Sequence, residues 1–79
     1  PPPTLAERVE AARRHLEMSL EWKGDHAGIV EMRRHYGNYF KGLPRFKEYK
    51  KVLLTSYEKE EVFSTLALIS EIYRAEVPA

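Results

Sequence analysis

The sequence contains no cysteine in its 79 residues. It therefore has no disulfide framework, no thiol nucleophile and no thiolate metal ligand, a composition that fits a cytoplasmic protein. The three histidines, His15, His26 and His35, form neither an H-x-x-x-H nor an H-E-x-x-H pair, so we expect no metal site. Glycine-rich phosphate loops and nucleophile–base patterns are also missing. We therefore expect no catalytic residue and no cofactor site within these residues, and a binding function instead.

Long apolar runs are missing as well. No run approaches the roughly 20 residues of a membrane span, and there is no signal-peptide pattern, so we expect no membrane partner. A chain of this length makes one small domain with a stability of about 5 kcal/mol. We expect residues 1–3, which are prolines without an initiator Met, to end a stiff linker of a longer protein. Residues 4–75 should form a single domain, and residues 76–79 a frayed tail.

The net charge of +1 hides a strong charge asymmetry along the chain. Residues 1–32 carry four Lys and Arg against six Asp and Glu, and residues 52–79 carry two against five. Residues 33–51 carry seven against one, a net charge of +6. Aromatic rings are interleaved with these cations: His35, Tyr36, Tyr39, Phe46 and Tyr49. Cations that neutralise phosphates, among rings that offer stacking faces, indicate a polyanion-binding surface. The alternative is a solvated basic face over core aromatics.

Apolar residues recur with helical spacing in four segments. The expected helices are Leu5–Trp22, His26–Phe40, Pro44–Leu54 and a last helix from Thr55 or Ser56 to about Arg74. No run of three or more residues has the pattern of a strand. We therefore predict an all-α fold, a compact four-helix bundle with short connections.

Local signals mark the expected helix ends. Thr4 and Glu7 have the spacing of a capping box, in which each side chain accepts a hydrogen bond from the other residue's backbone N–H. Gly24 permits the positive φ that ends a helix, and Asp25 can cap the next one. Further along the chain, the expected signals are Gly42 as a C-terminal cap, Pro44 in a first helical turn, and a second capping box of Thr55 or Ser56 with Glu58.

The first helix has two apolar faces. One is formed by Leu5, Val9, Ala12, Leu16 and Leu20, and the other by Ala11, His15, Met18 and Trp22. A helix with two apolar faces has two partners, of which one is the bundle. The second partner could be another part of a longer protein. Alternatively, Trp22 simply covers the end of the bundle.

The second helix is expected to present its cations around a buried stripe. The stripe consists of Ile29, Met32, Tyr36, Tyr39 and Phe40. Arg34 and Lys41 lie on the opposite side, and Arg33 and His35 lie at the two edges of the stripe. Gly37, on the polar side, costs about 1 kcal/mol relative to Ala in a helix. Its missing side chain would let a backbone or a phosphate come close, unless it is simply a tolerated weak position.

Residues 23–42, KGDHAGIVEMRRHYGNYFKG, resemble the C-terminal helical region of bacterial tRNA-dihydrouridine synthases of the B type. The family pattern is close to K-G-x-x-x-G-x-x-E-M-R-K-H, a few residues, then W-Y-x-K-G. Arg34 stands where Lys is common, and Asn38 stands where a Trp usually precedes the Tyr. The resemblance extends upstream through Ala12–Leu16 to the prolines before Thr4, and so covers essentially the whole chain.

The resemblance implies an oxidoreductase with an N-terminal TIM barrel that binds FMN and uses NADPH to reduce a uridine of tRNA. A cysteine of that barrel serves as general acid. The catalytic residue, FMN and NADPH are therefore expected in a domain outside this sequence. The helical bundle is expected to grip the tRNA, whose shape and backbone a basic helical face can recognise. The implied partners are tRNA and the protein's own barrel.

The candidate RNA-binding residues come from two sources. Those that match the family's basic motif are Arg33, Arg34, His35 and Lys41, and those added on charge alone are Arg45, Lys47, Lys50 and Lys51. Arg33 and His35, at the stripe's edges, could instead bond within the domain. The alternative function is a protein-interaction module that docks a partner through the face of Ala11, His15, Met18 and Trp22, which could also be where the bundle meets its barrel.

Overall fold

The computed structural model describes residues 2–76, with side chains up to Arg74. Its five helices are α1 (Leu5–Lys23), α2 (Asp25–Met32), α3 (Tyr36–Tyr39), α4 (Lys47–Thr55) and α5 (Lys59–Glu76). No strand occurs in this part of the chain, which confirms the all-α prediction. Glu76, expected in the tail, is the last residue of α5, whereas residues 77–79 and the first linker residue, Pro1, lie outside the described residues.

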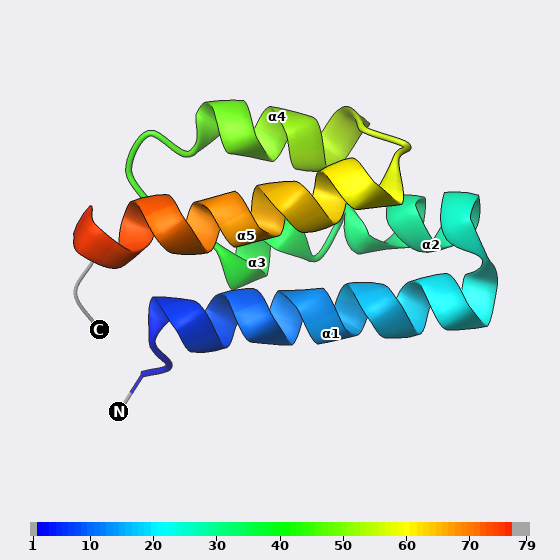
Figure 1. Cartoon of the computed structure of the whole chain (residues 1–79), viewed down its shortest axis with the longest axis horizontal. Coiled ribbons are helices and arrows are strands. Elements are labelled where there is room, and N and C mark those ends of the chain that lie inside the picture. Colours follow the sequence, from blue (N-terminus) through cyan, green and yellow to red (C-terminus); the bar gives the residue numbers. More distant parts are fainter. Residues whose placement is uncertain (1, 77–79) are drawn as a thin grey trace.

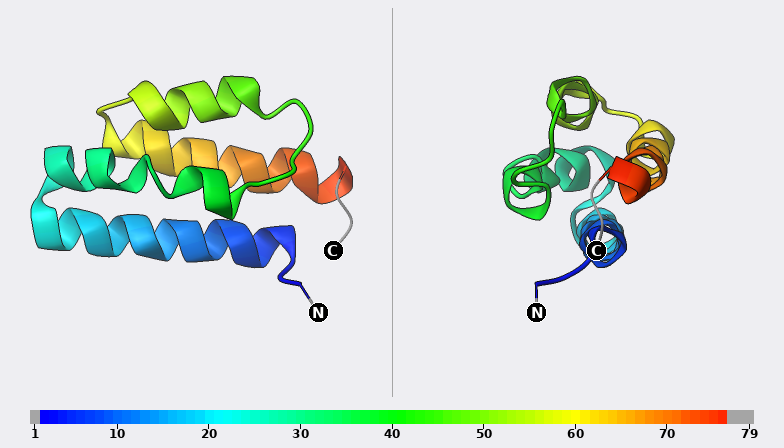
Figure 2. Two further views of the ribbon diagram at one scale, coloured as in Figure 1. Left: turned by 180° about the vertical axis from the view of Figure 1, so that it is seen from behind. Right: turned by 90° about the vertical axis from the view of Figure 1, so that its left-hand side faces the viewer.

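The helices run alternately in opposite directions. Figure 1 shows α1 running one way, α2 and α3 returning beside it, α4 running forward again and α5 returning between α4 and α1. In the end-on view of Figure 2, α1, the α2–α3 pair, α4 and α5 occupy four corners around one core. The molecule is thus a bundle with four helical positions around one core, in which two short helices share the place of the single second helix predicted from the sequence.

The expected helix His26–Phe40 is broken at Arg33–His35, and in this respect the prediction was wrong. The backbone tightens there, because the N–H of Arg33 donates to the carbonyl of Val30 at 3.2 Å and that of His35 to Met32 at 2.9 Å. The chain has neither Pro nor Gly at this point. The side chains of Arg33 and His35 contact different neighbours, the α4–α5 connection and α1, and such tertiary contacts leave no signature in apolar periodicity.

The helix expected from Pro44 begins instead at Lys47. Arg45 has a φ of 52° and Gly42 a φ of 87°, so the backbone is left-handed at both positions and cannot continue a right-handed helix. Pro44 therefore lies in an irregular connection between α3 and α4, rather than in a first helical turn. The positive φ of Gly24 (85°) at the C-cap of α1 confirms the helix-ending role predicted for it. Gly42 also has a positive φ, but the C-cap of α3 is Phe40, so the prediction of Gly42 as the cap was wrong.

The predicted caps have mixed outcomes. The N–H of Thr4 donates to the Glu7 carboxylate at 2.7 Å and the N–H of Glu7 to the Thr4 hydroxyl at 3.1 Å, which confirms the first capping box. Asp25 makes no capping bond, because Gly24 is the N-cap of α2 and the Asp25 carboxylate lies 3.2 Å from Nζ of Lys59.

The second capping box is absent from the connection between α4 and α5. The hydroxyl of Thr55 donates to the carbonyl of Lys51 at 2.7 Å, so Thr55 closes α4 rather than opening α5. The Ser56 hydroxyl accepts from the N–H of Glu58 at 3.1 Å, one residue before α5 begins, and so shapes the turn. Both hydroxyls bond to nearby backbone, which is the competing role of Ser and Thr at helix ends.

The inward stripes of the helices form one core. Its buried apolar members are Leu5, Val9, Ala12, Leu16, Met32, Tyr36, Phe40, Leu43, Leu53, Val62, Leu66, Ile69 and Tyr73. The predicted second face of α1 lies outside this core, since Met18 is 60% exposed and Trp22 is 84% exposed. Trp22 therefore does not cover the end of the bundle.

The backbones of α1 and α2 approach closely at Gly28 of α2. The buried Ser19 hydroxyl of α1 donates to the carbonyl of Gly28 at 2.9 Å. A Cβ on Gly28 would lie 2.7 Å from the carbonyl oxygen of Ser19 and 2.8 Å from Cα of Leu20. These are backbone atoms of α1, which cannot swing aside as a side chain does. Glycine at this position therefore sets the distance at which α2 crosses α1.

Adding one methyl group at Gly28 should destabilise the protein. Gly28→Ala is expected to lower the free energy of unfolding by about 1–3 kcal/mol, because the helices must separate. The matched control is Gly37→Ala in α3, where an added Cβ meets nothing within 4 Å. This substitution should raise the stability by up to about 1 kcal/mol, through helix propensity. Urea unfolding followed by circular dichroism measures both, and equal stabilities of the two variants would contradict the close-approach argument.

Candidate nucleic-acid interface

Several Lys and Arg side chains of the described residues are neutralised by ion pairs within the molecule. The ion pairs are Arg13 and Arg14 with Glu10, Arg13 also with Glu17, Lys23 and Arg34 with Glu31, Lys59 with Asp25, and Arg74 with Glu71. Arg8 and Arg33 donate to backbone carbonyls instead. Four lysines have no ion pair with any described residue: Lys41, Lys47, Lys50 and Lys51. Available positive charge is thus concentrated in one segment.

These four exposed lysines lie on the α3–α4 connection and on α4. The only acid between Arg33 and Lys51 is Glu48, so the segment lacks partners for its cations. Lys47 and Lys51 are i, i+4 neighbours on α4, a spacing at which like charges repel. An exposed group of cations without internal partners can bind the phosphates of a polyanion without first breaking an ion pair.

Three of these lysines surround a depression of about 480 Å³, which we call the lysine pocket. It is lined by Lys41, Lys47, Lys50, Gly37, Gly42 and Phe46, over a floor of Tyr36, Phe40 and Leu43. The floor belongs to the core, since its three side chains are at most 9% exposed. Burial raises the pKa of Tyr36 to about 12, so the floor stays uncharged at neutral pH. Lys51 does not line the pocket.

The predicted basic motif is divided among three environments. The Arg33 guanidinium donates to the Ser56 carbonyl at 3.3 Å and lies 4.7 Å from the centroid of the Tyr57 ring. Arg34 is exposed and pairs with Glu31. The half-buried His35 ring packs against His15 with a centroid distance of 4.5 Å. Arg33 and His35 thus make their contacts within the domain.

Arg45, also predicted from charge, is exposed but does not line the lysine pocket. It occupies the left-handed position before α4 and so helps to turn the chain into that helix.

Two side chains, one half-buried and one buried, hold the backbone of the α3–α4 connection, which carries Lys41. Neither role is predicted from the sequence. Arg8 of α1 donates through Nε to the carbonyl of Tyr39 at 2.7 Å and through Nη2 to that of Lys41 at 2.8 Å. The hydroxyl of Tyr73 on α5 donates to the carbonyl of Pro44 at 2.6 Å. Apolar spacing reveals which residues face inward but not which carbonyl a polar group reaches, so no sequence signal marks these bonds.

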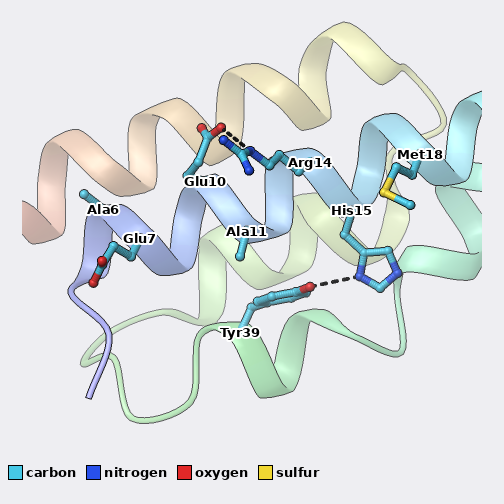
Figure 3. Close-up of a pocket in the computed structure, with 8 residues that line it drawn as sticks. All are labelled: Ala6, Glu7, Glu10, Ala11, Arg14, His15, Met18 and Tyr39. Atoms are coloured by element: carbon cyan, nitrogen blue, oxygen red, sulfur yellow. Dashed lines mark hydrogen bonds and ion pairs between the residues drawn. The ribbon is translucent and has the colours of Figure 1, made fainter. Parts of the chain in front are cut away.

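The second face of α1 lines two adjoining depressions. The larger one, of about 730 Å³, is bordered by residues such as Glu10, Ala11 and Met18, as Figure 3 shows. On its floor, Nδ1 of His15 and the hydroxyl of Tyr39 share a hydrogen bond of 3.0 Å. The smaller one, of about 250 Å³, continues past His15 and Met18 to Trp22. The cations that line these two depressions, Arg14 and Lys23, are paired with Glu10 and Glu31. This face therefore has fewer cations available to a polyanion than the lysine pocket has.

Charge pairing and burial shift the pKa values of three side chains in this region. The guanidinium groups of Arg13 and Arg14 lower the pKa of Glu10 to about 2. Lys23 and Arg34 lower the pKa of Glu31. Burial, with His35 close by, lowers the pKa of His15 below its usual 6.5. At neutral pH both carboxylates are therefore ionised and the His15 imidazole is uncharged.

Within residues 2–76, no helix is both long enough and apolar enough to cross a membrane. The same residues contain no group of three or more His, Cys, Asp or Glu side chains that could hold a metal ion.

A family model described as dihydrouridine synthase matches residues 1–75 of the 79. The chain therefore belongs to the dihydrouridine synthase family, whose substrate is tRNA. No curated protein and no solved structure matches the chain. The family assignment is independent of the charge distribution.

Arg33 and Arg34 are adjacent, but their substitution should have different effects on stability. Arg33→Ala removes a hydrogen bond and a cation–π contact, so the free energy of unfolding should fall by about 1–2 kcal/mol. Arg34→Ala should leave stability nearly unchanged, because an exposed ion pair contributes little. Chemical denaturation compares the two variants directly. Equal stabilities would refute the structural role of Arg33.

The lowered pKa of His15 makes stability depend on pH. Below its usual pKa the unfolded chain binds a proton at His15 that the folded protein resists. The stability that the neutral His15 ring contributes is therefore fully present above about pH 6.5 and is lost as the pH falls through and below that value. Thermal melting between about pH 8 and pH 5 should show a smaller loss for His15→Gln than for the wild type. Parallel curves for the two proteins would exclude His15 as the source.

Proposed function

We propose that this chain is the tRNA-binding helical domain of an FMN-dependent tRNA-dihydrouridine synthase of the bacterial B type. Membership of the family and the resemblance of residues 23–42 to the family's C-terminal helical region support this assignment. The observation that carries it is the set of four exposed lysines without ion pairs on the α3–α4 connection and α4. The parent protein would be an NADPH-dependent oxidoreductase of the cytoplasm, where its tRNA substrate is found.

In this proposal the domain positions tRNA and leaves the chemistry to the barrel. A flavin needs an apolar slot for its ring system, with polar groups at the ring edge. The resemblance of residues 23–42 to the family's C-terminal helical region implies that the flavin site lies in another domain of such enzymes. FMN and NADPH would therefore be held by the TIM barrel, which would also be the domain's intramolecular partner.

The lysines would act on the tRNA backbone rather than on base edges. Folded tRNA is recognised largely through shape and phosphates, to which flexible ammonium groups adapt. Lys41, Lys47, Lys50 and Lys51 would provide the main contacts. Arg34 would have to leave Glu31 before it could contribute.

A second candidate function rests on the exposure of Met18 and Trp22. We infer that the second face of α1, which includes Ala11 and His15, would dock a protein surface, either the barrel of the parent enzyme or another protein. Exposed apolar patches are typical of such contacts. Binding through this face would depend little on salt, whereas phosphate contacts weaken steeply with ionic strength.

Substitution of two unpaired lysines by glutamine should weaken tRNA binding and should also make that binding less dependent on salt concentration. For Lys47→Gln with Lys51→Gln, the slope of log K against log salt concentration should become shallower by about 2, because two phosphate contacts are lost. The matched control, Arg14→Gln with Arg74→Gln, removes the same net charge from paired sites. Filter binding of unmodified tRNA between about 50 and 200 mM salt measures both variants.

The control variant should bind like the wild type. Equal losses in the two double variants would mean that only net charge matters, and would contradict the assignment of these lysines. Absence of tRNA binding by the wild type at low salt would refute the proposed function of this chain.

A further inference from the structure

The lysine pocket has a shape that a flat phosphate-binding face does not need. Its walls are the flexible side chains of Lys41, Lys47 and Lys50, and its interior is uncharged. Gly37 and Gly42 stand on its border without side chains, and a Cβ added to either would meet nothing within 4 Å. The pocket is thus open at its border and apolar at its base, with cations around it.

The half-buried ring of Phe46 gives this pocket a fixed apolar wall. Its centroid lies 5.3 Å from that of Phe40 and 6.1 Å from that of Tyr73, so the ring is held by core aromatics rather than free to rotate outward. The backbone on either side is held by Arg8 and by the Tyr73 hydroxyl. The pocket is therefore formed before any ligand arrives.

A base-paired nucleotide cannot use such a site. In a duplex the base is stacked and paired, so its faces are covered and a protein meets only the groove edges and the sugar–phosphate backbone. An unpaired nucleotide can leave the stack and place its ribose and base in a concave, apolar site while its phosphates stay at the surface. The pocket's volume of about 480 Å³ lies within the range of small-ligand sites, about 300–1,000 Å³.

We propose that the lysine pocket binds one unpaired nucleotide of RNA, with Lys41, Lys47 and Lys50 around its phosphates and its ribose and base against Phe46 and the glycine border. This rests on the proposed function, but it adds a preference for unpaired over paired RNA. Lys51, one residue beyond Lys50 and outside the pocket, contacts a neighbouring phosphate without reading the pairing state.

The test uses two RNA hairpins that differ only by a single-nucleotide bulge in the stem. Fluorescence anisotropy measures the affinity of the 79-residue chain for each at constant salt. The wild type should bind the bulged hairpin about tenfold more tightly, the effect of accommodating one base.

Two pairs of variants separate the pocket from the surrounding charge. Gly37→Gln places a neutral side chain at the pocket border and keeps every cation, so it should abolish the bulge preference. Its control is Asn38→Gln, at the exposed neighbouring position outside the pocket, which should keep it. Lys50→Gln should likewise reduce the preference, whereas Lys51→Gln should weaken binding of both hairpins by the same factor. Circular dichroism confirms that each variant retains its helices.

The outcomes distinguish this inference from the proposed function. Equal binding of the two hairpins by the wild type, a bulge preference that survives Gly37→Gln, or identical effects of Lys50→Gln and Lys51→Gln would each overturn the nucleotide pocket. The lysines would then act as a general phosphate-binding face, as already proposed. Binding of neither hairpin would overturn both proposals.

Discussion

The backbone contact between α1 and α2 at Gly28 is the constraint on which the other parts of the fold depend. Because Gly28 has no side chain, α2 can pass within hydrogen-bonding distance of the buried Ser19 hydroxyl of α1. The chain then returns along α1 through α3, which brings the carbonyls of Tyr39 and Lys41 to Arg8. The candidate RNA-binding segment therefore owes its position to a contact more than ten residues earlier in the chain.

Charge is arranged so that attraction within the molecule and attraction to a partner use different residues. On α1 and α2 the acids Glu10 and Glu31 each collect two or more cations. On α4 three lysines lie within five residues, and Glu48 is the one acid of that helix. Their mutual repulsion is a small cost to helix stability, of a few tenths of a kcal/mol per pair. The proposed phosphate-binding surface would account for this cost.

The sequence predicts what is decided locally. Thr4 and Glu7 cap α1, Gly24 and Gly42 take positive φ, and charge counting locates the unpaired lysines, all from patterns a few residues long. It does not predict the break at Arg33–His35, the left-handed Arg45 or the bonds of Arg8, because each depends on groups distant in the chain. For the same reason, a motif of three adjacent basic residues could not reveal that Arg33 contacts the α4–α5 connection and His35 contacts α1.

Fastening of the α3–α4 connection at both ends has an entropic consequence. If this connection of seven residues, between Tyr39 and Lys47, were free, it would lose on the order of 1–2 kcal/mol of backbone conformational entropy per residue when a ligand ordered it. Here Arg8 and Tyr73 have already fixed the backbone during folding. In the proposed binding of RNA only lysine side chains would have to be immobilised, so a greater part of the electrostatic attraction would remain as affinity.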